Sequence, residues 1–150
     1  MNEVNTKLAS RWKRLGGSLM DGLISSVIIF PFMFITGVFQ RALRGQEMTI
    51  EQHITLVIFS WVIFLILNGY LLANRGQTIG KVVVKTKIVD LDGNIPSFGK
   101  LLFLRYLVIG LVSQIPIFGG FVGLVNALFI FGKERRCLHD YIAGTRVVEA

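Results

Sequence analysis

ASRWKRLGGSLMDGLISSVIIFPFMFITGVF, residues 9–39, decides the fold because a basic cluster here runs directly into a long apolar segment. From residue 15 to residue 39 the only ionisable side chain is that of Asp21. These 25 residues, rising about 1.5 Å each in a helix, are enough to cross a hydrocarbon core of roughly 30 Å. We therefore predict a transmembrane helix over residues 15–39.

Asp21 is the unusual residue of this helix. A carboxylate at the middle of a membrane helix costs on the order of 2.5–3.5 kcal/mol on insertion scales, so such residues face a partner or a wet cavity. Arg14 lies seven residues earlier, on nearly the same helix face but about 10 Å away along the axis, too far for a direct pair. We expect Asp21 to pair with Arg105 instead, and Asp140 to meet Arg14 at the inner interface.

The composition describes a membrane protein with one domain, residues 1–150. Hydrophobic residues make up 53% of the chain, and the mean hydropathy is +0.63. The 16 Lys and Arg outnumber the 9 Asp and Glu, but they lie in short blocks between apolar runs. Such blocks are topology signals, and the aromatic residues lie mostly inside the apolar runs, so we expect no nucleic acid partner. The single cysteine, Cys137, allows no internal disulfide, and we expect no cofactor.

The second span is predicted over residues 54–73, which carry no charged side chain. The polar loop before it, residues 40–53, contains two Arg and two Glu and fits the external side of the membrane. The segments before residue 15 and between residues 74 and 94 are positively charged on balance, which favours the cytoplasm. We therefore expect an inner-membrane protein with both termini in the cytoplasm.

The third apolar region, residues 101–131, is too long for one upright helix and short for two full spans. Lys133, Arg135 and Arg136 follow it, and a single crossing would place them outside. Two short passes, residues 101–115 and 119–131, turning near Pro116 and Gly119, return them to the cytoplasm. A three-span arrangement remains the alternative.

Two short β-branched segments form the expected cytoplasmic β element. Residues 84–90 end in a turn signal at Asp92-Gly93, and residues 145–148 are similar in character. We expect the two strands to pair, because an isolated strand leaves backbone groups without hydrogen bonds. The predicted fold class is thus an all-α integral membrane protein with four transmembrane segments, the last two a short hairpin, and a small cytoplasmic β element.

Several motifs in this order resemble the RDD family of membrane proteins, named for one Arg and two Asp. The matching stretches are Arg14 with Asp21, GQTIGK at residues 76–81, Ile88-Val89-Asp90 with Gly93, Arg105, and CLHDYIAGT at residues 137–145. By this resemblance Arg14, Asp21 and Asp140 take the three name-giving positions. The resemblance implies, as the best-supported activity among relatives, the exchange of monovalent cations such as Na⁺ for protons.

Two functions from different classes follow. In the first, Asp21 alternates between a proton and Na⁺ within a charge cluster of Arg14, Asp21, Arg105 and Asp140. Four short helices are few for a gated pathway, so this exchanger would be a homo-oligomer. In the second, the same charges form structural ion pairs, and the protein is a non-transporting module that binds anionic lipid or a partner protein. No catalytic triad is recognisable around His139, so we expect no enzyme, and no metal site other than a possible Na⁺ at Asp21.

Overall fold

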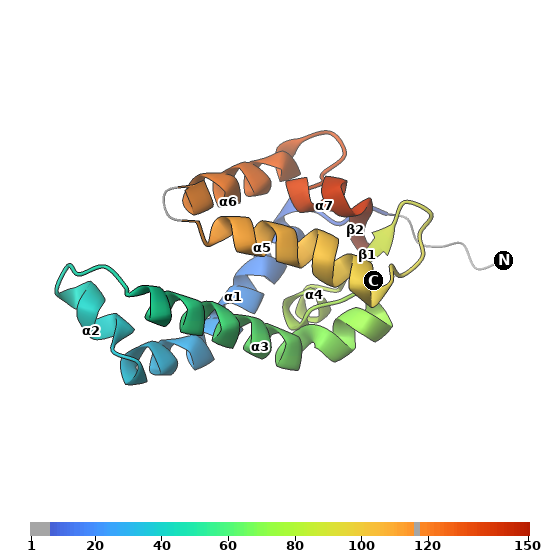
Figure 1. The fold of residues 1–150 in the computed structure, drawn as a ribbon. Helices are drawn as coiled ribbons and strands as arrows, with labels where there is room; N and C mark the ends of the chain where they lie inside the picture. Colours follow the sequence, from blue (N-terminus) through green and yellow to red (C-terminus); the bar gives the residue numbers. More distant parts are fainter. Residues whose placement is uncertain (1–6, 116–117) are drawn as a thin grey trace.

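Two long helices, α1 (Arg11–Ile35) and α3 (Ile50–Arg75), dominate the computed structural model, which describes residues 7–115 and 118–150 (Figure 1). Ser10 begins α1, and its side chain accepts a hydrogen bond from the Lys13 amide at 3.2 Å. Thr49 begins α3 in a capping box with Gln52. Both helices therefore start at side-chain caps, and Arg11, Lys13 and Arg14 belong to the first turn of α1 rather than to a separate segment.

The two long helices expose their apolar side chains on the outside of the molecule, as helices in contact with lipid do. Within α1 the buried residues are Arg14 and Gly17, and within α3 they are Asn68 and Leu72. Large apolar side chains are instead exposed along both helices: Leu23, Val27, Phe30, Phe34, Ile54, Ile58 and Ile66. This inside-out pattern, together with the length of each helix, is what a membrane-spanning helix requires.

A short helical hairpin packs beside them. Its first arm joins η1 (Lys100–Leu107), a π-helix, to α5 (Val108–Ser113), and its second arm joins α6 (Phe118–Leu128) to η2 (Phe129–Phe131). Each arm covers residues 100–113 or 118–131, about 21 Å at 1.5 Å per residue. Our expectation of four transmembrane segments is therefore not confirmed, because in the described part of the chain only α1 and α3 are long enough to cross.

The turn of this hairpin falls where the sequence places it. Residues 113 and 118 bracket it, and Gly119 lies in the first turn of α6, where its amide donates to the Ile115 carbonyl at 2.8 Å. Pro116, the other residue expected at the turn, lies outside the described residues. The hairpin is thus observed, but its arms are shorter than the membrane is thick.

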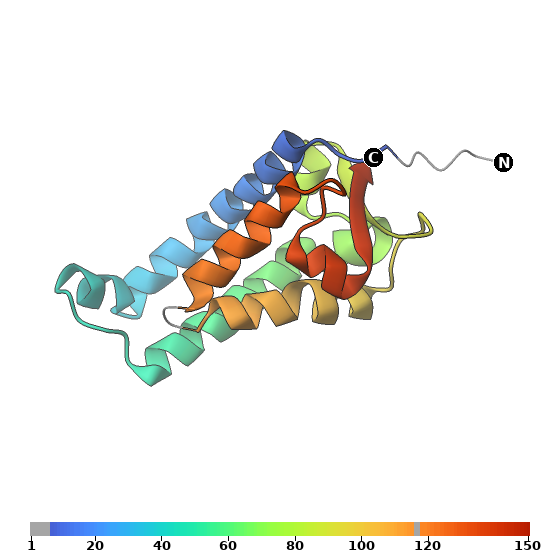
Figure 2. The same ribbon diagram turned by 90° about the horizontal axis from the view of Figure 1, so that it is seen from above.

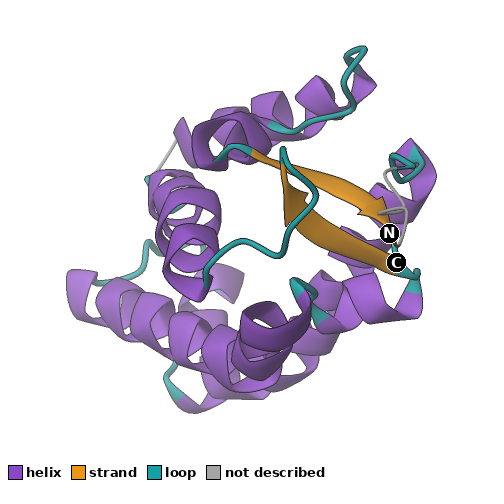
Figure 3. Cartoon of the chain, turned by 90° about the vertical axis from the view of Figure 1, so that its right-hand side faces the viewer, coloured by secondary structure: helices purple, strands orange, loops and turns teal. Residues whose placement is uncertain are grey.

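The polar end of the molecule holds a small sheet. Strand β1 (Thr86–Asp90) pairs antiparallel with β2 (Thr145–Glu149), so that Ile88 lies opposite Val147 (Figure 3). This confirms the predicted pairing. The N-terminal segment adds to the free edge of β2, because the Ala9 amide donates to the Val147 carbonyl at 3.1 Å. A buried apolar core of Ala9, Leu72, Ile88, Leu101 and Val147 lies beneath the sheet.

Two short helices complete this end, α4 (Ile79–Val83) before β1 and α7 (Leu138–Ala143) before β2. The opposite end carries α2 (Val38–Leu43) and the loop that leads into α3 (Figure 2). Of the 16 Lys and Arg, only Arg41 and Arg44 belong to that opposite end. The positive charge of the chain is therefore concentrated where the sheet, α4 and α7 lie.

Candidate functional site

A buried ion cluster joins three elements at the polar end. Asp140 in α7 is 0% exposed and lies between Arg14 of α1 and Arg105 of η1. Its Oδ2 accepts a hydrogen bond from Arg14 Nη2, and its Oδ1 accepts one from Arg105 Nη1. Arg105 Nη1 also donates to Thr145 Oγ1 at 2.6 Å. One carboxylate thus ties the first helix, the hairpin and the start of β2 together.

The surroundings of Asp140 keep it ionised. Burial alone would raise the pKa of this carboxyl, but the charge of Arg105, followed by His139 and Arg14, holds its pKa well below its usual range. The Cys137 amide also donates to Oδ2 at 3.0 Å, which fixes the carboxylate as the cap of its own helix. Asp140 is therefore a permanent charge near neutral pH and does not carry a proton.

Asp21 has a different set of partners. Its Oδ2 accepts a hydrogen bond from the Thr78 hydroxyl at 2.5 Å, and its Oδ1 accepts one from the Gly80 amide at 2.7 Å. The neighbouring Ile79 amide donates to Asn68 Oδ1 at 2.9 Å. Side chains from α1 and α3 thus satisfy the first amides of α4, which have no partner inside that helix. Asp21 acts as a cap supplied from another helix.

The pairing expected for the charge cluster is half right. Arg14 meets Asp140, as predicted, but the predicted pair between Asp21 and Arg105 is wrong, since Arg105 binds Asp140. The physical reason is that the polar backbone end of α4 lies against α1 at the height of Asp21, so the carboxylate finds neutral donors there. Asn68 makes an inter-helix hydrogen bond, as a polar residue in a membrane helix is expected to do.

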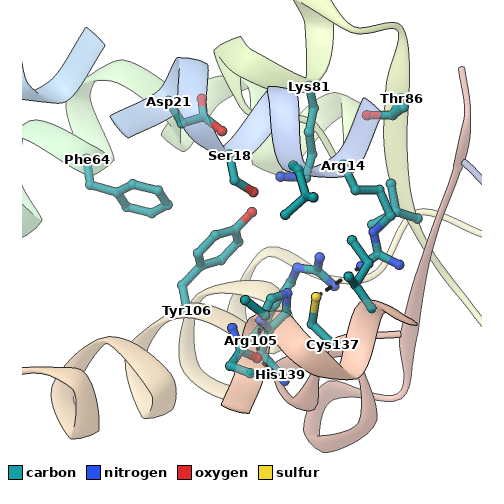
Figure 4. Close-up of a pocket in the computed structure, with 15 residues that line it drawn as sticks. Arg14, Ser18, Asp21, Phe64, Lys81, Thr86, Arg105, Tyr106, Cys137 and His139 are labelled. Carbon is teal, nitrogen blue, oxygen red and sulfur yellow. Dashed lines mark hydrogen bonds between the residues drawn. The ribbon is translucent and has the colours of Figure 1, made fainter. Parts of the chain in front are cut away.

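A cavity of about 300 Å³ lies between these two clusters (Figure 4). Its walls come from α1, α3, α4, η1, α6, α7 and both strands. Three cationic side chains line it, those of Arg14, Lys81 and Arg105, against the single carboxylate of Asp21. In Figure 4 the Tyr106 hydroxyl points towards Ser18, and Lys81 reaches down from α4 into the same space. The cavity wall is mostly apolar, but the charged groups that line it are positive on balance.

Three potential metal ligands, Cys137, His139 and Asp140, lie with their ligand atoms within 4.8 Å of one another. Both Asp140 oxygens, however, accept from arginines, and Cys137 Sγ accepts from Arg14 Nη2 at 3.7 Å. Burial raises the pKa of the Cys137 thiol, so it stays protonated. A cation placed here would meet two guanidinium groups and a neutral thiol, so this arrangement suits an ion pair and does not suit a metal.

His139 is neutral although Asp140 lies nearby. Its Nε2 is 3.9 Å from Asp140 Oδ2, but burial and then the charge of Arg105 lower its pKa to about 3. Asn126 Oδ1 accepts from the His139 backbone amide at 3.1 Å and lies 2.9 Å from Nδ1, so Nδ1 carries the proton. His139 and Asn126 therefore fasten α7 to α6 by neutral hydrogen bonds.

The model of the RDD family matches residues 8–144, nearly the whole chain. The chain belongs to the RDD family. Two proteins of Bacillus subtilis (strain 168), both named as uncharacterized proteins, are similar over most of their length. YckC is 36% identical over 147 residues, covering 96% of this chain and 86% of its own. YxaI is 28% identical over 157 residues, covering 95% and 97%. No solved structure matches.

This RDD protein is thus a membrane-type protein whose name-giving residues occupy two separate clusters. Arg14 and Asp140 belong to the ion cluster, and Asp21 belongs to the cap of α4. Sequence reasoning missed Lys81 and Tyr106 as cavity residues. For Lys81 a signal was present, because Thr78 three residues earlier is a helix-cap residue that places Lys81 in the first turn of α4.

Proposed function

We propose that this RDD protein is a non-transporting membrane module that holds its basic end against an anionic phospholipid surface. Helices α1 and α3 cross the membrane, the hairpin inserts part of the way, and both termini lie in the cytoplasm. The observation that carries this proposal is that Arg14, Asp21, Arg105 and Asp140 all have fixed internal partners. Charges held in this way build the structure, and the protein is neither an enzyme nor dependent on a cofactor.

The exposed charges supply the binding surface. Arg75, Lys85 and Lys133 are exposed at the polar end, and their side chains make no ion pair with any described residue. Each Lys or Arg near an anionic leaflet contributes about 1 kcal/mol of attraction. At the opposite end Arg41 and Arg44 are balanced by two Glu in the same loop. The attraction therefore acts on one end of the molecule only.

A lipid comparison tests this proposal. The full chain is placed in nanodiscs of phosphatidylcholine with or without phosphatidylglycerol, and hydrogen exchange is followed at β1 and at residues 132–136. We expect phosphatidylglycerol to slow exchange in both segments of the wild type, and Lys85→Glu/Lys133→Glu to lose this difference. The matched control is Arg41→Glu/Arg44→Glu, which makes the same change of charge at the opposite end. Equal exchange in the two lipids would overturn the proposal.

Exchange of Na⁺ for protons at Asp21 is the second candidate, because no arginine or lysine forms an ion pair with this carboxylate among the described residues. Against it stands Lys81, whose Nζ lies 3.4 Å from Thr78 Oγ1, the group that donates to Asp21. A fixed cation beside the carboxylate opposes the binding of another cation. An exchanger of this size would also act as a homo-oligomer, with partner copies enclosing the pathway.

Proton flux in proteoliposomes separates the two candidates. A pH-sensitive dye reports flux after addition of Na⁺, K⁺ or Li⁺ to the wild type and to Asp21→Asn, each shown to be folded. We expect no cation-dependent flux from either protein. Flux from the wild type that disappears in folded Asp21→Asn would replace our proposal with exchange.

A further inference from the structure

Three buried donors on residues that line the cavity make no hydrogen bond of good geometry with a described residue. They are Arg105 Nε, the Thr86 hydroxyl and the Tyr106 hydroxyl, although the Arg105 and Tyr106 side chains do interact with each other. Arg105 is 3% exposed and Thr86 is 0% exposed, and all three residues line the cavity. Buried polar groups in native proteins nearly always have partners, so these three point to a ligand or water in this space.

The charges around the cavity do not balance. Arg14, Arg105 and Lys81 carry three positive charges, whereas Asp21 and Asp140 carry two negative ones, which leaves one positive charge. A net charge in a partly enclosed cavity favours an anion there. Lys81 is the cation without a carboxylate partner within ion-pair distance among the described residues, and it extends into the cavity (Figure 4).

We propose that this cavity binds one phosphate group. Its donors come from different walls: Arg105 and Tyr106 from η1, Lys81 from α4 and Thr86 from β1. A planar carboxylate offers two oxygens in one plane, whereas a tetrahedral phosphate presents several oxygens in different directions. The volume of about 300 Å³ is at the lower end of the range for small-molecule sites, so a phosphate group fits inside the cavity.

The position of the cavity allows the phosphate to come from either of two sources. Ser18 lines the cavity and is exposed, so the cavity reaches the surface beside α1. Ser18 is seven residues into α1, about 10 Å from its start. A phospholipid headgroup reaches this depth from the membrane interface, and inorganic phosphate reaches it from the cytoplasm.

The test uses variants that remove one ligand group each. Lys81→Gln removes the amine, and Tyr106→Phe removes only the hydroxyl, while the ion cluster around Asp140 stays intact. Arg44→Gln and Tyr70→Phe are the matched controls, because both residues are exposed and lie outside the cavity, and Arg44 lies at the opposite end from the basic surface. Thermal unfolding of the detergent-purified full chain is followed with increasing inorganic phosphate against chloride at equal ionic strength. Native mass spectrometry measures the binding of phosphatidic acid against phosphatidylcholine.

We expect phosphate, phosphatidic acid or both to bind the wild type and the two controls. Each cavity variant should weaken binding by about 3–10-fold, as expected for the loss of one hydrogen bond, and the double variant should lose it. Binding of phosphatidic acid alone identifies a lipid headgroup as the source, and binding of inorganic phosphate identifies the free anion. Binding of neither, or equal binding to Lys81→Gln/Tyr106→Phe, would overturn the inference.

This inference stands apart from the proposed function. The cavity variants leave Lys85 and Lys133 in place, so the slowing of hydrogen exchange by phosphatidylglycerol should persist in them. A cavity that binds no phosphate would therefore leave the surface proposal standing. Conversely, a protein insensitive to phosphatidylglycerol could still bind inorganic phosphate in the cavity.

Discussion

Two aspartates of this chain show that the same type of side chain can have two different structural roles. Asp140 is neutralised by two arginines inside the protein, and its charge fixes three elements. Asp21 lies in the long apolar helix α1 and accepts from a hydroxyl and an amide, and among the described residues no arginine or lysine forms an ion pair with it. The partners of each residue, rather than its type, therefore decide whether it forms an ion pair or caps a helix.

Replacing Asp140 tests the ion cluster. Asp140→Asn keeps the size of the side chain but leaves Arg14 and Arg105 facing each other without an acid. Removal of one member of a buried ion cluster costs about 3–5 kcal/mol. We expect a corresponding loss of stability in chemical unfolding of the purified protein in detergent.

The control for this variant is Glu134→Gln, because Glu134 forms an exposed pair with Arg136 at 3.1 Å. Exposed pairs contribute between about 0 and 1 kcal/mol. If Asp140→Asn unfolds at the same denaturant concentration as Glu134→Gln, the ion cluster does not hold the fold together.

His139 predicts how stability depends on pH. Its pKa falls from 6.5 to about 3 in the folded protein, so between these values the unfolded chain binds more protons than the folded one. Stability therefore rises with pH through this window and is lost as the pH falls below 6.5, by at most about 1.4 kcal/mol per pH unit. Thermal unfolding between pH 7.5 and 4.5 measures this slope. His139→Gln should flatten it, and an unchanged slope in this variant would assign the effect elsewhere.

For single residues, the sequence correctly predicted part of the ion cluster. Arg14 and Asp140 were predicted to meet because both flank apolar spans on the same side of the membrane. Arg105 was assigned to the wrong acid because Asp21 accepts from the Thr78 hydroxyl and the Gly80 amide instead, and nothing in the sequence around Arg105 indicates this.

Among the elements, α4 depends on one close contact. A side chain at Gly80 would overlap the Gly17 carbonyl of α1 and would lie 2.8 Å from Asp21 Cγ. Gly80→Ala must therefore push α4 away from α1, at a cost of about 1–3 kcal/mol. Gly22→Ala in α1 is the control, because a side chain there meets nothing within 4 Å and alanine favours the helix. Thermal unfolding compares the two, and equal stability would mean that α4 does not need this contact.

This helix was not predicted, whereas the sheet was. The β-branched run at residues 84–90 and its turn signal were enough to place a strand. Residues 79–83 are only five in number and include a glycine, so no helical period is visible. Asp21 of α1 and Asn68 of α3 accept hydrogen bonds that hold α4 in place, and such long-range partners leave no local signal. The cap at Thr78 is a local signal, but a cap residue by itself does not define a helix.

For the whole molecule, the proposed topology places the two ends of the bundle on opposite sides of the membrane. Single cysteines test it at Lys133 and at Arg44, which lie at the polar end and the α2 end. A membrane-impermeant maleimide should label Arg44→Cys in intact cells and Lys133→Cys only after permeabilisation. The native Cys137 is buried, so its own labelling should be weak. Labelling of both positions from the same side would contradict the topology.

The number of spans is the least predictable feature at this scale. The charges after residue 131 predicted that the chain returns to the cytoplasm there, and the structure contains the hairpin that this return requires. Its arms are nevertheless too short to cross an average bilayer, which hydropathy alone does not reveal because residues 101–131 are almost uninterrupted apolar sequence. Charge and hydropathy thus indicate where the chain turns but not how deeply each arm inserts.

The ion cluster also imposes an order on biosynthesis. Arg14 and Asp140 are 126 residues apart, so at about 5–20 residues per second the ribosome needs roughly 6–25 s to make the second after the first. During this interval α1 and α3 are already available for insertion, while Arg14 and Arg105 await their shared acid. The strand β2, which closes on the segment before α1, is made later still. A nascent chain arrested before α7 would therefore display two uncompensated arginines at the membrane surface, which distinguishes an unfinished molecule from a finished one.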